Sequence, residues 1–301
     1  MATRTNWTGV GTALVTPFTR NGDVDEGAFR RLARRQVDAG VHILVPCGTT
    51  GEVPTLTAAE KVRLVTIAIE EAKGKALVLA GAGGYDTREV IHMVNEFQKI
   101  GADGILSVTP YYNRPTQEGL FQHYRAIAES TSLPIILYNV PGRTGCNIEP
   151  ATLVRLAAIP NIAGVKEASG NISQIAEICR SVPPNFVVLS GDDALTVPLM
   201  ALGGHGIISV ASNEVPAEMV ALVEAFERGD LATAQRLNNQ LMPLMQINFV
   251  ESSPGPVKFA MSEMGLCEAN YRLPMVPVSD ASAEKIRKIL HGTPWPSMVK
   301  A

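Results

Sequence analysis

The sequence is poor in the features that mark membrane, secreted and nucleic-acid-binding proteins. Its 301 residues carry 26 basic and 29 acidic side chains without a basic run, which argues against nucleic acid as the main partner. No apolar window is long enough to span a bilayer, and the start, Met-Ala-Thr-Arg-Thr-Asn, lacks the apolar stretch of a signal peptide. The four cysteines lie apart without a pairing motif, as is typical of reduced thiols. With 46% hydrophobic and 18% charged residues, we expect a soluble, cytoplasmic globular protein.

The patterns of catalytic metal sites and hydrolase triads are also missing. The five histidines show no ligand spacing, and no cluster of His, Cys and Asp suggests a bound metal, so we expect neither metal nor cofactor. Ser169 and Ser190 have no positioned His or Asp partner in the sequence, which argues against a hydrolase.

Short apolar segments alternate with segments of helical period up to about residue 228. The strand candidates are Gly9–Thr16, His42–Cys47, Ala76–Gly81, Gly104–Val108, Pro134–Asn139, Ile162–Glu167, Phe186–Ser190 and Gly206–Val210. The helix candidates are Asp25–Gly40, Thr57–Lys73, Asp86–Ile100, Gln117–Ser130, Glu149–Ala158, Ile172–Cys179, Ala194–Leu202 and Ala217–Arg228. Because the strands are uniformly apolar, they suit a parallel sheet covered on both faces.

Eight such units predict an α/β fold, a (β/α)8 TIM barrel with a C-terminal helical appendage. The alternative is a six-stranded open sheet, which is weakened because no Gly-rich dinucleotide loop follows the first strand. Beyond about residue 229 the pattern becomes helical, with helices expected at Leu231–Val250, Pro256–Met264 and Ala281–His291. We therefore expect a catalytic barrel over residues 1–228 and a helical region over residues 229–301 that serves packing or subunit contact.

Lys166 differs from the other eight lysines because it lies near the end of an apolar run, Ile162–Glu167, that is typical of a buried strand. The others lie in polar or helix-like segments. Since removing an ammonium from water is costly, burial drives a lysine towards its neutral form. A neutral amine is a nucleophile that can form a Schiff base with a carbonyl substrate. The plainer alternative is a strand-end lysine whose head reaches solvent.

The loops that follow other strands carry hydroxyl groups and a guanidinium, at the end of a barrel where active sites lie. After the second strand, residues Gly48–Glu52 (Gly-Thr-Thr-Gly-Glu) offer backbone N–H groups to an anion such as a carboxylate. A stiff loop with Tyr111 and Tyr112 follows the fourth strand. Tyr138 ends the fifth strand, and Arg143 follows in a turn, where it could hold a carboxylate bidentately. Each residue alone has a structural explanation, but together they supply what imine chemistry needs.

Two glycine-containing loops argue against a phosphorylated substrate. The loop after the seventh strand, Gly191-Asp192-Asp193, is acidic, whereas a phosphate site needs N–H groups and neutral or basic character. The run Gly203-Gly204-His205-Gly206 precedes the eighth strand instead of following it. We infer a metal-independent lyase with a non-phosphorylated carboxylate substrate.

These motifs closely resemble those of the dihydrodipicolinate synthase family, now called 4-hydroxy-tetrahydrodipicolinate synthase. Their order and spacing match from about Gly9 to beyond Leu273-Pro274-Met275, essentially the whole chain. The motifs are Gly48-Thr49-Thr50-Gly51-Glu52, Thr109-Pro110-Tyr111-Tyr112-Asn113-Arg114-Pro115, Tyr138-Asn139-Val140-Pro141-Gly142-Arg143-Thr144-Gly145 and Gly164-Val165-Lys166-Glu167.

The resemblance implies a reaction and a role for each candidate residue. Lys166 would form a Schiff base with pyruvate, and the resulting enamine would attack L-aspartate 4-semialdehyde, giving 4-hydroxy-tetrahydrodipicolinate in the diaminopimelate and lysine pathway. The turn at Thr49 and Thr50 would hold the pyruvate carboxylate, and Tyr138 would be the general acid and base. In addition, Thr49 would pass the proton to Tyr112, Arg143 would bind the semialdehyde carboxylate, and backbone atoms around Gly191 and Ile208 would line the pyruvate site.

The resemblance also implies self-association. The family is usually a homotetramer of two tight dimers, and Tyr112 would reach into the site of a neighbouring subunit, which requires at least a homodimer. N-acetylneuraminate lyase and sugar-acid aldolases share the lysine and the tyrosine, but the combination of Thr49, Tyr112 and Arg143 favours the synthase. The alternatives are a sugar-acid or 4-hydroxy-2-oxoglutarate aldolase and a barrel that only binds a keto acid, which would need a damaged relay.

This sequence departs from the family pattern at the residues associated with feedback inhibition by lysine. Lysine-inhibited members commonly place histidines and an asparagine around a pocket between subunits. The comparable positions are Ala58, Lys61 and Tyr85, although Glu89 and Tyr111 remain. Since Lys61 would repel the ammonium groups of lysine, we expect weak or absent inhibition.

Overall fold

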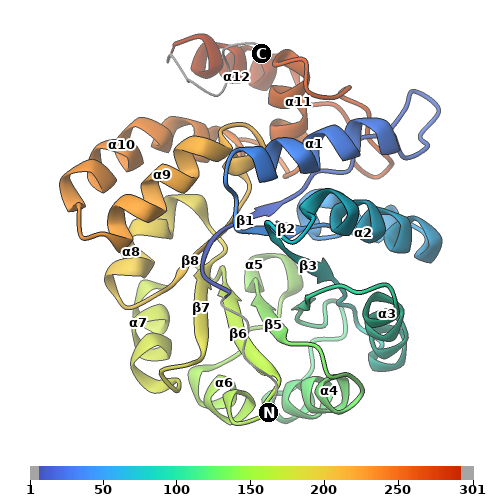
Figure 1. Ribbon diagram of the computed structural model, residues 1–301, viewed down its shortest axis with the longest axis vertical. Coiled ribbons are helices and arrows are strands. Elements are labelled where there is room, and N and C mark those ends of the chain that lie inside the picture. Colours follow the sequence, from blue (N-terminus) through green and yellow to red (C-terminus); the bar gives the residue numbers. More distant parts are fainter. Residues whose placement is uncertain (1–6, 293–301) are drawn as a thin grey trace.

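The computed structural model describes residues 7–292, which form a closed barrel of eight parallel strands surrounded by helices (Figure 1). The strands follow one another in sequence order, and β1 closes the barrel by pairing with β8. Their bounds are β1 Gly9–Ala13, β2 Ile43–Val45, β3 Leu77–Gly81, β4 Gly104–Val108, β5 Ile135–Asn139, β6 Ile162–Glu167, β7 Val187–Ser190 and β8 Gly206–Ser209. The predicted TIM barrel is confirmed, and the open-sheet alternative is wrong.

Two glycines allow the barrel to close between its first and last strands. Gly206 has a φ of 129°, and a Cβ at this position would lie 2.0 Å from the carbonyl oxygen of Gly9. Gly9 has a φ of 85°, and its added Cβ would lie 2.6 Å from the ring of His42. A side chain at either position would therefore push β1 away from its neighbours.

The helices on the outside of the barrel follow the predicted order. They are α1 Glu26–Asp38, α2 Ala58–Ala72, α3 Thr87–Lys99, α4 Gln117–Glu129, α5 Pro141–Thr144, α6 Pro150–Ala157, α7 Ile172–Ser181, α8 Thr196–Ala201 and α9 Pro216–Glu227. The short helix α5 was not predicted, because the sequence suggested a plain turn around Arg143. Pro141 begins this helix, where its fixed φ is favourable, and Gly145 ends it in the left-handed conformation.

The predicted C-terminal helices are confirmed as α10 Leu231–Ile247, α11 Gly255–Glu263 and α12 Asp280–Gly292. Figure 1 shows them, coloured orange to red, beside α1 and α9. They share one apolar core with the barrel, in which Leu244 and Ile286 contact the same cluster as Val10 and Ile207. Among residues 7–292, every helix is too short or too polar to cross a bilayer.

Candidate active site

Lys166 lies near the carboxyl end of β6 with 5% of its surface exposed, so its predicted burial is confirmed. It is in register with Tyr138 on the neighbouring strand β5. The Nζ atom of Lys166 lies 4.2 Å from the centre of the Tyr138 ring. Because the two residues are direct neighbours across the sheet, the fold holds the primary amine of Lys166 over the aromatic ring of Tyr138.

Gly191 and Ile208 border this pair from the two following strands. Gly191 follows β7 directly, and its N–H donates to the carbonyl of Glu167 at 2.8 Å. Ile208 on β8 is fully buried in the apolar cluster inside the barrel, which also contains Tyr138. The structure therefore brings four predicted site residues together at the same end of the barrel.

The hydroxyl turn after β2 is one turn of 3-10 helix, η1, at Thr49–Gly51. The Gly51 N–H donates to the Gly48 carbonyl at 3.0 Å, and the Thr16 hydroxyl donates to the Gly51 carbonyl at 2.7 Å. Thr50 is 4% exposed, whereas Thr49 is only partly buried. The turn is thus closed by its own hydrogen bonds and fastened to the loop that follows β1.

Thr49 and Arg143 line one cavity of about 230 Å³ at the mouth of the barrel. The other lining residues come from the ends of β2 to β5 and from the loops and helices that follow these strands: Val53, Pro54, Lys61, Gly83, Val108, Tyr111, Val140 and Thr144. Lys166 and Tyr138 do not line this cavity, because the Lys166 side chain lies against Tyr138 and over Gly191. The predicted residues therefore form two groups, a hydroxyl and guanidinium group at the mouth and an amine and phenol group on the strands.

Arg143 lies on α5 and is held from outside the barrel. Its Nη2 donates to the carbonyl oxygen of Ser253 at 3.2 Å, just before α11. Since its guanidinium has further donors, Arg143 can still offer them to a carboxylate in the cavity.

Tyr112 lies at the surface, where Arg143 is the one other predicted site residue that lines the same cavity. It is 93% exposed and has a φ of 69°, a strained conformation for a tyrosine. It borders a separate cavity of about 770 Å³ with Tyr111, Arg114 and Arg143. This exposure leaves the Tyr112 side chain accessible to another molecule.

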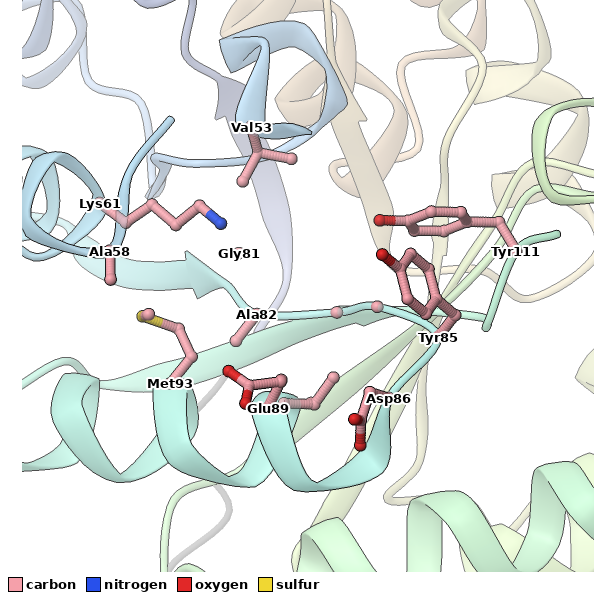
Figure 2. Close-up of a pocket in the computed structure, with 13 residues that line it drawn as sticks. Val53, Ala58, Lys61, Gly81, Ala82, Tyr85, Asp86, Glu89, Met93 and Tyr111 are labelled. Carbon is pink, nitrogen blue, oxygen red and sulfur yellow. The ribbon is translucent and has the colours of Figure 1, made fainter. Parts of the chain in front are cut away.

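The residues compared with a lysine-feedback pocket do form a single cavity of about 270 Å³ (Figure 2). Lys61 extends into it from α2, while Asp86 and Glu89 lie on the opposite side at the start of α3. Tyr85 and Tyr111 meet edge to face, with ring centres 5.2 Å apart. Burial raises the pKa of Tyr111 above its usual range.

Sequence reasoning missed a second buried lysine, Lys258 on α11, which is 0% exposed. Its position in a helix-like segment is confirmed, but its burial was not predicted. Its Nζ is 2.6 Å from Oε1 of Glu52, directly after the hydroxyl turn. Burial lowers the pKa of Lys258, and the Glu52 carboxylate favours the charged form. The available signal was its place between Val257 and Met261, on the apolar face of a helix.

Three kinds of comparison agree on the relatives of this chain. A model of the dihydrodipicolinate synthetase family matches residues 6–293. The chain is 51% identical to 4-hydroxy-tetrahydrodipicolinate synthase of Koribacter versatilis, over 93% of this chain and 94% of the relative. The enzyme of the same name from Chloroherpeton thalassium is 52% identical, with 94% of each chain covered. The crystal structure of dihydrodipicolinate synthase from Thermotoga maritima superposes with a TM-score of 0.94 at 44% identity, covering 96% of this chain and 99% of the other.

Proposed function

The chain belongs to the dihydrodipicolinate synthetase family, and from its site we infer that Lys166 forms an imine with pyruvate during catalysis. The enzyme is a lyase that produces 4-hydroxy-tetrahydrodipicolinate in lysine and diaminopimelate biosynthesis, the activity for which relatives with about half of their residues identical are named. That activity is favoured over the sugar-acid aldolase alternative. In our proposal its substrates are pyruvate and L-aspartate 4-semialdehyde.

The first step is attack of the Lys166 amine on the keto carbon of pyruvate, with loss of water. The imine then loses a proton from the methyl carbon to give an enamine, and that carbon attacks the aldehyde of the semialdehyde. The amino group of the semialdehyde then attacks the imine carbon and displaces the Lys166 amine, which closes the ring of the product and frees the enzyme. Tyr138, in register with Lys166, is the group that gives and takes these protons. The protonated imine nitrogen itself accepts the electron pair, so this scheme uses no cofactor and no metal.

The mouth of the barrel supplies the binding groups in this proposal. The turn at Thr49 and Thr50 holds the pyruvate carboxylate, beside backbone atoms of Gly191 and Ile208, and Arg143 holds the semialdehyde carboxylate. Thr49 passes a proton to Tyr112 of a neighbouring copy of the chain. This role suits the exposure of Tyr112, and it requires at least a homodimer, with a dimer of dimers as the proposed assembly.

The observation that carries the proposal is the burial of the Lys166 amine against the Tyr138 ring at the catalytic end of the barrel. Borohydride reduction in the presence of pyruvate, followed by peptide mass mapping, tests it. The peptide with Lys166 should gain the mass of a reduced pyruvate adduct. An adduct on Lys258 or on any other lysine, with Lys166 unmodified, would overturn the assignment.

A further inference from the structure

Lys258 belongs to the C-terminal region, yet its ammonium lies beside Glu52, at the end of the hydroxyl turn of the barrel. The Nζ atom donates to Glu52 Oε1 and to the carbonyl of Asn270, each at 2.6 Å. The rings of Phe18 and Tyr271 lie with their centres 4.4 and 5.0 Å from the same nitrogen. Both charged side chains are sealed from solvent, at 0% and 1% exposure. A buried pair of this kind is a poor source of stability, because desolvation offsets most of the attraction.

Glu52 stands at the end of the turn that begins with Thr49, and its backbone is in a strained conformation. Its φ of 53° and ψ of 35° are left-handed, a region that glycine adopts more readily. The Glu52 N–H donates to the Thr49 carbonyl at 3.1 Å. The left-handed backbone of Glu52 therefore ends the hydroxyl turn. Because this conformation is strained, contacts with other residues must stabilise it.

The C-terminal segment holds both oxygens of the Glu52 carboxylate. The Lys258 ammonium donates to Oε1, and the backbone N–H of Arg272 donates to Oε2 at 3.3 Å. The Arg272 guanidinium donates to the carbonyl of Thr55 at 2.9 Å and pairs with Glu60 on α2. The carboxylate is thus fixed from two directions by residues more than 200 positions away in the chain.

From these contacts we propose that Lys258 is a positioning residue for the reaction. Its ammonium holds the Glu52 carboxylate and thereby fixes the turn whose Thr49 and Thr50 face pyruvate. The C-terminal region is then part of the machinery that sets the pyruvate site, beyond packing or subunit contact. This inference rests on the roles proposed above for Thr49 and Thr50.

The test compares three variants by steady-state kinetics, borohydride trapping and thermal unfolding. Lys258→Met removes the ammonium at nearly constant length, and Glu52→Gln removes the carboxylate charge but keeps the shape. The matched control is Glu71→Gln, which breaks another buried carboxylate contact, made by Arg30 and Arg34 between α1 and α2. All rates are taken well below the unfolding transition of the least stable variant.

We expect Lys258→Met and Glu52→Gln to lower kcat/KM for pyruvate by about tenfold or more, because misplacement of a binding group by about 1 Å costs up to 10²-fold. The KM for the semialdehyde should stay within about twofold, since Arg143 is held separately through Ser253. Glu71→Gln should keep both constants near those of the unmodified enzyme even though its unfolding temperature falls.

Two results would overturn the inference. One is a pyruvate kcat/KM within about twofold of the unmodified enzyme in Glu52→Gln, whether or not Lys258→Met folds. The other is a fall in the pyruvate kcat/KM of Glu71→Gln that matches the fall in Glu52→Gln when both variants lose the same thermal stability. That result would show that lower stability alone reduces activity. Failure of the unmodified enzyme to trap pyruvate on Lys166 would instead refute the proposed function, so the two failures are distinguishable.

Discussion

The side chain of Lys166 passes over Gly191 so closely that a Cβ at position 191 would lie 3.0 Å from Lys166 Cε. The same added atom would lie 2.7 Å from the Cβ of Ala168. The Cβ of Ala168 is fixed to the backbone directly after β6, so the Lys166 side chain is the neighbour that would have to move. The absence of a side chain at Gly191 is thus a condition for the position of the amine.

Gly191→Ala should displace the Lys166 side chain and slow imine formation by about tenfold or more, because the reacting nitrogen leaves its productive position. Gly27→Ala on the surface of α1, where an added Cβ has no atom closer than 3.5 Å, is the matched control. Single-turnover borohydride trapping with pyruvate measures the rate. Equal trapping rates in the two variants would contradict the steric argument.

Arg143→Ala should impair the use of the semialdehyde far more than the capture of pyruvate. Loss of a bidentate carboxylate contact should raise the KM for the semialdehyde by about tenfold to a hundredfold. Pyruvate trapping on Lys166 should persist. Arg180→Ala, which removes only a surface pair with Glu177, serves as the control. A parallel loss of both steps would mean that Arg143 supports the fold of the mouth instead.

Tyr112 should act in the active site of another copy of the chain. Tyr112→Phe and Lys166→Ala should each be strongly impaired, but an equimolar mixture, unfolded and refolded together, should recover about a quarter of the normal activity. Half of the dimers then contain both variants, and each of these has one intact site. If Tyr112 acted within its own chain, the mixture would show no recovery.

Lysine should inhibit this enzyme weakly or not at all, because Lys61 places a positive charge in the cavity that Figure 2 shows. A lysine titration of the initial rate checks this expectation, and inhibition in the micromolar range would refute it. Lys61→Gln removes the repulsion but keeps a polar side chain, so it should bind lysine at least as tightly as the unmodified enzyme does, as isothermal calorimetry can measure.

Glu214 should make stability depend on pH in the neutral range. Burial raises the pKa of its carboxyl from 4.5 to about 8. Between these values the unfolded chain releases the proton while the folded protein keeps it, so stability falls as the pH rises through this window and levels off above about 8. The Nδ2 of Asn248 donates to Oε2 of Glu214 at 2.6 Å, whereas Oε1 of Glu214 is buried without a hydrogen-bond partner.

Glu214→Gln should therefore have a higher unfolding temperature than the unmodified protein at pH 8, and the difference should shrink as the pH falls towards 5. Differential scanning calorimetry over this range measures it. Glu227→Gln is the control, because Glu227 is exposed at the end of α9. It should show no such trend. A constant difference at every pH would mean that Glu214 does not titrate between the two values.

The order of strands and helices could be predicted from the sequence because the spacing of apolar residues in each element reflects which of its positions are buried. The strands Gly104–Val108 and Ile162–Glu167 match the prediction at both ends. Helix α5 could not be predicted from periodicity because its four residues span about one turn. The positions of Thr49, Tyr138 and Lys166 could be identified because chemistry-bearing residues stand at the ends of apolar strands or directly after them.

The contacts between these elements were decided only by the tertiary structure. Lys258 is 206 positions from Glu52, and nothing local in either segment indicates that one will neutralise the other. The exposure of Tyr112 and the crossing of Gly191 by Lys166 likewise depend on how whole loops pack. Local sequence determines which residues are buried in an element, whereas the partner of a buried charge depends on the packing of distant elements against one another.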